Sequence, residues 1–244
     1  MKFSGVLKFL LAVALFPSAA LCAVAAVKGF YSILAAIHNT LFFCAGVAVY
    51  MAVHMLLGGA GRVYIFAHEL AHALAGLMCG FKIKKFAAGA RDGYVTMDGT
   101  NAFVALAPYC VPVYAIFCAL GFYAASLKWD MSPYGSWFVG ALGFLLCFHI
   151  VNTIEILWAA KQSDLRQAGG VFFSCAVITA ANGIVMLAAF KLLYPEMISF
   201  RDSGVFVAQN TACFWRWTGL HAAALCRGAY AYALQIYTAR AQMK

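Results

Sequence analysis

The segment YIFAHELAHALAGL, residues 64–77, places two histidines and a glutamate in an otherwise apolar run. His68 and His72 are four residues apart, so on an α-helix both imidazoles lie on one face, with Glu69 beside it. In this HExxH pattern the histidines bind zinc and the glutamate is the general base toward a metal-bound water. In the alternative, these side chains only hydrogen-bond between packed helices, which leaves a buried carboxylate without a cation. The spacing therefore predicts one Zn²⁺ per chain, with Glu69 as the catalytic base.

A catalytic zinc usually takes three protein ligands and keeps one position for water, so a third ligand is needed. The remaining carboxylates and histidines are few: Asp92, Asp98, Asp130, Asp164, Glu155, Glu196 and Asp202, with His38, His54, His149 and His221. Asp164 is favoured because the HELAH helix exits at Gly80 and the next two apolar spans return the chain to that side. In the alternative, Asp164 only caps the helix that follows it.

A second group of polar residues lies in the apolar run FHIVNTIEILW. His149, Asn152 and Glu155 follow one another at intervals of three, which predicts one shared helix face. An ionisable group at membrane depth usually marks a functional site. These residues are candidates for orienting a zinc-bound histidine or for binding substrate, for example through an oxyanion contact from Asn152. The alternative is a polar contact between helices.

Composition defines the surroundings of this site. Of the 244 residues, 65% are hydrophobic and 10% are charged, and the mean hydropathy is +0.86. Because a typical globular domain has about 25% charged residues, the composition excludes a soluble domain and predicts a multi-pass integral membrane protein. The net charge of +9 indicates basic loops beside anionic lipid headgroups, and we expect no nucleic-acid partner. We expect a polytopic membrane domain at 1–193, with a core at about 62–174, and a tail at 194–244.

The apolar runs predict an all-α fold, because a spanning helix needs roughly 20 residues. About six transmembrane helices are expected, at about Val6–Val27, Tyr31–Leu57, Arg62–Cys79, Asn101–Leu127, Tyr134–Ala160 and Gly170–Leu193. Residues 1–27 could instead be a cleaved signal peptide. Alternation and paired Asp-Gly steps in residues 81–101 predict a short β-hairpin-like segment at the membrane edge. Trp215 and Trp217, with spaced arginines, predict an interfacial amphipathic helix in the tail, with a seventh span as the alternative.

These pieces together resemble a known family. HELAHALAG in a span, DGYVTMDG after it, ALAPYCVPVYA opening the next span and QSDL before another are similar to the site-2 protease class of intramembrane zinc metallopeptidases, and most of all to its compact M50B-like branch. The resemblance covers roughly Arg62 to Ser174. It implies that Asp164 completes the zinc site and that the substrates are transmembrane proteins, cut within or beside their spans. The chain departs from the family pattern at Asp164, which is followed by Leu165 in place of glycine and has no Asn-Pro stretch before it.

Two other functions remain open at this point. A divalent-metal transporter would use the HExxH-like site as an ion station, with His38, Asn39 and Asp164 as further stations. A prenyl-protein protease would take a glutamate as third ligand, for which Glu155 is the candidate. The transporter is disfavoured because the HELAH helix contains no proline break and the sequence shows no repeat symmetry.

Basic residues in the connecting segments favour a site near the cytoplasmic face, since Lys and Arg are enriched there. Two basic residues, Arg62 and Lys128, are expected in loops on the side opposite the site. The loops on the side of the site hold seven: Lys28, Lys82, Lys84, Lys85, Arg91, Lys161 and Arg166. Six spans would nevertheless place Lys2, Lys8 and the basic tail outside, so the rule cannot hold at both ends.

Overall fold

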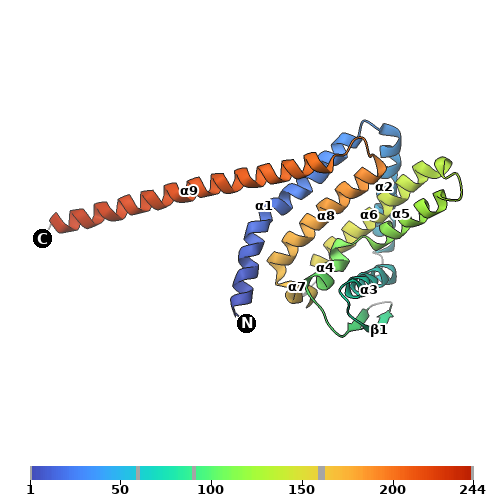
Figure 1. The fold of residues 1–244 in the computed structure, drawn as a ribbon, viewed down its shortest axis with the longest axis horizontal. Helices are drawn as coiled ribbons and strands as arrows, with labels where there is room; N and C mark the ends of the chain where they lie inside the picture. Colours follow the sequence, from blue (N-terminus) through green and yellow to red (C-terminus); the bar gives the residue numbers. More distant parts are fainter. Residues whose placement is uncertain (1, 59–60, 90–91, 159–162, 243–244) are drawn as a thin grey trace. The chain divides into compact units, whose positions relative to one another are not determined.

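The structure is a computed structural model that describes residues 2–58, 61–89, 92–158 and 163–242. Four residues used in the sequence predictions lie outside these ranges: Arg91, Ala160, Lys161 and Gln162 of the QSDL motif. The chain is mostly helical, with one small sheet (Figure 1). Its elements are α1 Lys2–Ile33, α2 Ile37–Leu57, α3 Gly61–Met78, β1 Ile83–Ala88, β2 Gly93–Met97, α4 Ala102–Cys110, α5 Val113–Ser126, a 3-10 turn η1 Ser132–Tyr134, α6 Gly135–Trp158, α7 Ser163–Ala168, α8 Val171–Leu193 and α9 Phe200–Gln242.

Four helices within the described ranges are long and apolar enough to cross a membrane: Gly5–Ile33, Ile37–Leu57, Ser132–Trp158 and Val171–Leu193. A fifth is added if the bent pair α4–α5 counts as one span. These helices are consistent with an all-α membrane protein, as the composition predicts. The HELAH helix forms as α3, but it is not among the candidate spans. The number of six spans therefore stays a prediction.

The fourth predicted span, residues 101–127, consists of two helices whose axes differ by 70°. The break follows from Pro112, which comes directly before α5. Pro112 has no backbone N–H, so it cannot bond the carbonyl of Pro108 as a continuous helix requires. Val111 is extended, with φ −113° and ψ 110°, because a following proline disfavours the helical region. The pair α4–α5 is therefore a broken span or a re-entrant loop.

Long helices pack in two pairs, α1 with α8 and α2 with α6 (Figure 1). Glycines bring the backbones of each pair together. A Cβ at Gly46 of α2 would overlap the backbone carbonyl of Gly140 on α6, and a Cβ at Gly183 of α8 would lie 2.7 Å from the backbone of Cys22 on α1. Backbone contact of this kind is common between membrane helices, where small residues permit dispersion forces to act at short range.

The β-hairpin forms as the sequence predicts. β1 and β2 pair antiparallel, with a register irregularity between Ile83 and Lys85. The hairpin packs on α3, where a Cβ at Gly76 would collide with the sulfur of Met97, and Phe66 of α3 meets Phe86 of β1 edge to face at 5.9 Å. The sheet is thereby held against the helix that carries the HExxH motif.

The chain divides into two compact units, Met1–Phe200 and Arg201–Lys244. The second unit is helical, as predicted for the tail, and forms most of the 43-residue helix α9. α9 is not among the candidate spans of the described chain. Its position at a membrane interface stays a prediction.

Candidate metal centre

α3 presents both histidines of the HExxH motif on one face, with ring centroids 4.9 Å apart. The helix can approach α4 closely because small residues line the contact. Ala71 and Ala75 of α3 are buried against Val104 and its neighbours on α4. α4 therefore lies directly beside the two imidazoles.

Asp164, 96 and 92 residues beyond the histidines in sequence, lies directly opposite them. Its Oδ2 is 3.6 Å from Nε2 of His68 and 3.6 Å from Nε2 of His72. Two ligands at 2.0–2.1 Å from a tetrahedral zinc ion are about 3.4 Å apart. The separations therefore fit one ion between the three side chains. Among the residues that the structure describes, this is the group of three or more His, Cys, Asp and Glu that could hold a metal.

The second nitrogen of each imidazole is hydrogen-bonded, and this directs the first toward Asp164. Nδ1 of His72 lies 2.8 Å from the carbonyl of Val104, so it carries the proton and donates it. Nδ1 of His68 lies 3.2 Å from the hydroxyl of Tyr64. A metal-binding histidine typically has such a partner, which fixes its tautomer and ring orientation. Both Nε2 atoms therefore face Oδ2 of Asp164, and each would offer a lone pair to a cation there once its imidazole is neutral.

Asp164 is held in place from α4. The hydroxyl of Tyr109 donates to its Oδ2 at 3.0 Å. Burial raises the pKa of Asp164, but hydrogen bonds from His68, His72 and Tyr109 outweigh burial and keep the pKa well below its usual range. The residue is therefore a carboxylate at neutral pH, which is the form that binds a cation.

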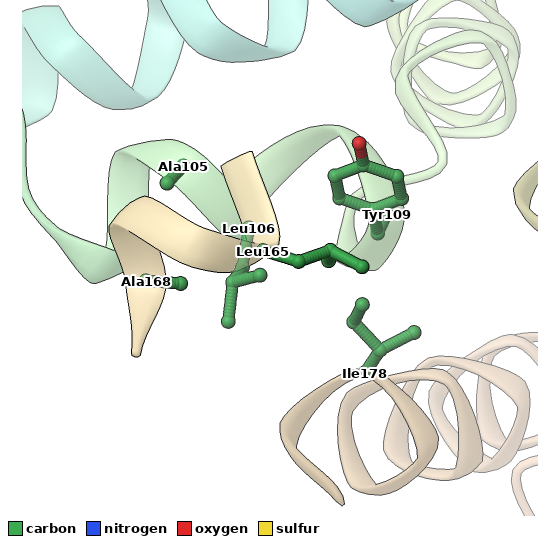
Figure 2. Close-up of a cluster of buried hydrophobic side chains, with 6 residues drawn as sticks. All are labelled: Ala105, Leu106, Tyr109, Leu165, Ala168 and Ile178. Atoms are coloured by element: carbon green, nitrogen blue, oxygen red, sulfur yellow. The ribbon is translucent and has the colours of Figure 1, made fainter. Parts of the chain in front are cut away.

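The short helix α7 that carries Asp164 is anchored in an apolar cluster. Leu165 and Ala168 of α7 pack with residues of α4 and α8: Ala105, Leu106, Tyr109 and Ile178. Figure 2 shows Leu165 between Tyr109 and Ile178, while the hydroxyl of Tyr109 points out of the cluster. The same tyrosine therefore supports α7 with its ring and Asp164 with its oxygen.

Glu69 is 8% exposed and lies between the histidines and the hairpin. The backbone of Val95 on β2 hydrogen-bonds to its carboxylate. A Cβ at Gly93 would lie 2.8 Å from Cγ of Glu69 and 2.7 Å from Cγ2 of Ile65, so glycine provides room for the glutamate. The edge of β2 thus fixes the position of the predicted base.

A cavity of about 630 Å³ opens over these groups. It is lined by the three residues of the HExxH motif, by β2 from Gly93 to Met97, and by Asp164 and Gln167 of α7. A volume of this order accommodates several residues of an extended peptide or a small molecule. The predicted base, the three metal-capable side chains and a strand edge all meet in this one cavity.

His149 connects to the site indirectly. Its Nε2 donates to Oδ1 of Asn182 on α8 at 3.1 Å, and Nδ2 of Asn182 donates to the carbonyl of Tyr109 at 2.8 Å. Tyr109 in turn donates to Asp164. The geometry is compatible with the predicted supporting role, although the chain of contacts leads to the carboxylate and not to a histidine.

Asn152 and Glu155 do not reach the cavity and contact α2. Nδ2 of Asn152 donates to the hydroxyl of Tyr50 at 2.6 Å, and Oε1 of Glu155 lies 2.8 Å from Nε2 of His54. The hydroxyl of Tyr50 also lies 3.1 Å from Nδ1 of His54. Each step of three residues falls about 60° short of a helical turn, so the face rotates about 120° from His149 to Glu155. This rotation explains why the three residues face different neighbours.

Sequence reasoning missed three supporting residues, namely Tyr64, Tyr109 and Asn182. Tyr64 lies four residues before His68, so helical periodicity could have identified it. Tyr109 and Asn182 carry no such signal, because their contacts depend on how α4, α7 and α8 cross.

Comparison of the chain with known protein families, curated proteins and solved structures gives no match. The functional argument therefore rests on the residues and their geometry.

Proposed function

We propose that the protein is an intramembrane zinc metalloprotease that hydrolyses peptide bonds within or beside the transmembrane segments of other membrane proteins. The single observation that carries this proposal is the approach of Asp164 to both histidines of an HExxH motif. Two nitrogens and a carboxylate oxygen form a donor set that suits zinc and leaves a fourth position open. His68, His72 and Asp164 would hold one ion per chain.

When bound, zinc lowers the pKa of a coordinated water and polarises a substrate carbonyl. Glu69 would take a proton from the attacking water and deliver it to the leaving nitrogen. Its place in the lining of the same cavity as both histidines supports this role. Val95 and Gly93 keep the carboxylate at the floor of the cavity.

The strand β2 supports binding of substrate in an extended form. Within the described sheet β2 pairs only with β1, and its residues from Gly93 to Met97 line the cavity. A peptide bond in a helix is shielded by the helix itself, and a substrate must unwind before water can reach it. Main-chain hydrogen bonds to a free strand edge would offset part of the cost of that unwinding.

The proposed setting is a multi-pass membrane domain of six spans, in which α3 crosses the bilayer. The polar face of α3 is turned toward α4, α7 and the hairpin, which agrees with the rule that ionisable groups at membrane depth face the protein interior or a water-filled cavity. The basic residues near the hairpin favour the cytoplasmic side.

A transporter would need further ion stations along a path, and two contacts argue against it. His38 lies 3.3 Å from the hydroxyl of Ser136, and that hydroxyl donates to Oδ1 of Asn39. These residues link the start of α2 to the start of α6, so they are occupied in a helix contact. A prenyl-protein protease with Glu155 as ligand is disfavoured by the contact between Glu155 and His54.

The test compares cells that make the wild-type protein with cells that make Glu69→Gln. Membrane-protein termini are mapped in both, and the zinc content of both purified proteins is measured. We expect new termini within or beside transmembrane segments with the wild type alone, and equal zinc in the two proteins. If the two kinds of cell have identical membrane-protein termini but differ in metal content, the transporter hypothesis would replace the protease hypothesis.

A further inference from the structure

The first helix carries one charged side chain in its apolar part. Between Lys2 and Lys28, Lys8 is the single charged residue. Its Nζ donates to the backbone carbonyl of Ala168, 3.2 Å away, in a half-buried position. Placing an ammonium group in an apolar helix is costly, so its partner indicates what it does.

That partner is the C-terminal end of α7, the helix that carries Asp164. Six residues are too few for a helix to be stable alone, and its last carbonyls have no partner within the helix. Leu165 offers its carbonyl to the N–H of Gly170 at 2.7 Å and to the hydroxyl of Ser174 at 3.2 Å. Ala168 offers its carbonyl to Lys8. A cation at a helix C-terminus is also favoured by the helix dipole.

The surroundings of Lys8 are shaped to admit its side chain. Gly169 has φ +144°, and a Cβ there would lie 2.6 Å from Cδ of Lys8. One turn further along, the ring of Phe172 on α8 lies 5.7 Å from the rings of both Phe9 and Phe16 on α1. The first half of α1 therefore fits closely against the corner between α7 and α8.

We propose that Lys8 is a positioning residue of the metal centre. Through Ala168 it holds α7, the six-residue helix at whose other end Asp164 faces the two histidines. A shift of α7 would change both Nε2–Oδ2 distances together, so the contact sets how long the ion is retained. α1 is on this account a working part of the metal centre. The inference rests on the zinc site of the proposed function.

The test measures how fast zinc passes from the purified full-length protein to a colorimetric chelator. Lys8→Met should accelerate transfer about tenfold, the lower end of the effect of outer-shell changes. Lys8→Arg should restore the wild-type rate, because the guanidinium can donate to the same carbonyl. Lys28→Met, the same substitution on the same helix, should leave the rate unchanged. The thermal transition of the zinc-free proteins should be alike, which separates positioning from general stabilisation.

The inference would be overturned if Lys8→Met and the wild type released zinc at the same rate, or if Lys8→Arg accelerated release as much as Lys8→Met does. It would also be overturned if purified protein that has lost residues 1–27 still held zinc. If Lys8→Met and Lys8→Gln both fail to fold while Lys28→Met folds, Lys8 is a folding residue and the inference also fails. A wild-type protein that binds no stoichiometric zinc would instead contradict the metal centre itself. The two proposals therefore fail in distinguishable ways.

Discussion

The hydroxyl of Tyr109 and Oδ2 of Asp164 lie 3.0 Å apart, and that oxygen is the one facing both histidine Nε2 atoms. The tyrosine thus restrains the atom that would bind the metal. Tyr109→Phe keeps the ring in the apolar cluster and removes only this restraint. We expect zinc affinity to fall about tenfold, measured by competition with a chelator, with little change in thermal stability. An unchanged affinity would show that the apolar cluster alone positions Asp164.

Asp164→Asn tests the third ligand directly. Replacing the carboxylate by an amide removes the negative charge and leaves an oxygen that binds a metal ion more weakly. Zinc affinity should therefore fall at least about a hundredfold. Asp98→Asn is the matched control, because Asp98 lines the same cavity but accepts the backbone N–H of Lys82, and it should retain zinc. In the Asp164→Asn background, Tyr109→Phe should have no further effect, since it acts through Asp164. Wild-type zinc content in Asp164→Asn would reduce Asp164 to a helix cap.

Gly93→Ala tests the position of the base without touching a metal ligand. The added Cβ would approach Cγ of Glu69 to 2.8 Å and force it to move. We expect proteolysis to fall about a hundredfold, within the range of general-base effects, while zinc stays bound. Gly135→Ala is the control, because a Cβ there meets no atom within 4 Å. Full activity in Gly93→Ala would show that Glu69 needs no fixed position.

Glu155→Gln should leave zinc binding and proteolysis unchanged within about twofold, because Glu155 contacts His54 and does not reach the cavity. Its side chain is 54% exposed, so losing the pair should cost less than about 1 kcal/mol of unfolding free energy. Zinc content and the thermal midpoint provide the measurement. Loss of zinc from this variant would revive the prenyl-protease alternative, in which Glu155 is a ligand.

The sequence predicted the parts of this site that depend on local periodicity and on chain direction. HExxH spacing defines one helix face whatever surrounds it, and the hairpin follows from alternation and Asp-Gly turns. Asp164 could be selected because apolar spans return the chain to a known side. Its role as a ligand stays a prediction.

The parts that could not be predicted depend on how helices cross. The sequence places Asn152 and Glu155 near one face of a helix, but only the packing of the helices shows that this face contacts α2. The break in residues 101–127 was missed because a hydropathy window averages across it. The signal was nevertheless present in Pro108 and Pro112, each of which lacks the N–H that a continuous helix requires.

The 70° break between α4 and α5 has a consequence for the surrounding lipid. α5 has 14 residues and is about 21 Å long, shorter than the roughly 30 Å hydrocarbon core. A bilayer adapts to a short apolar segment by thinning around it. Headgroups and water would then lie closer to the membrane midplane beside α5 than beside the longer apolar helices.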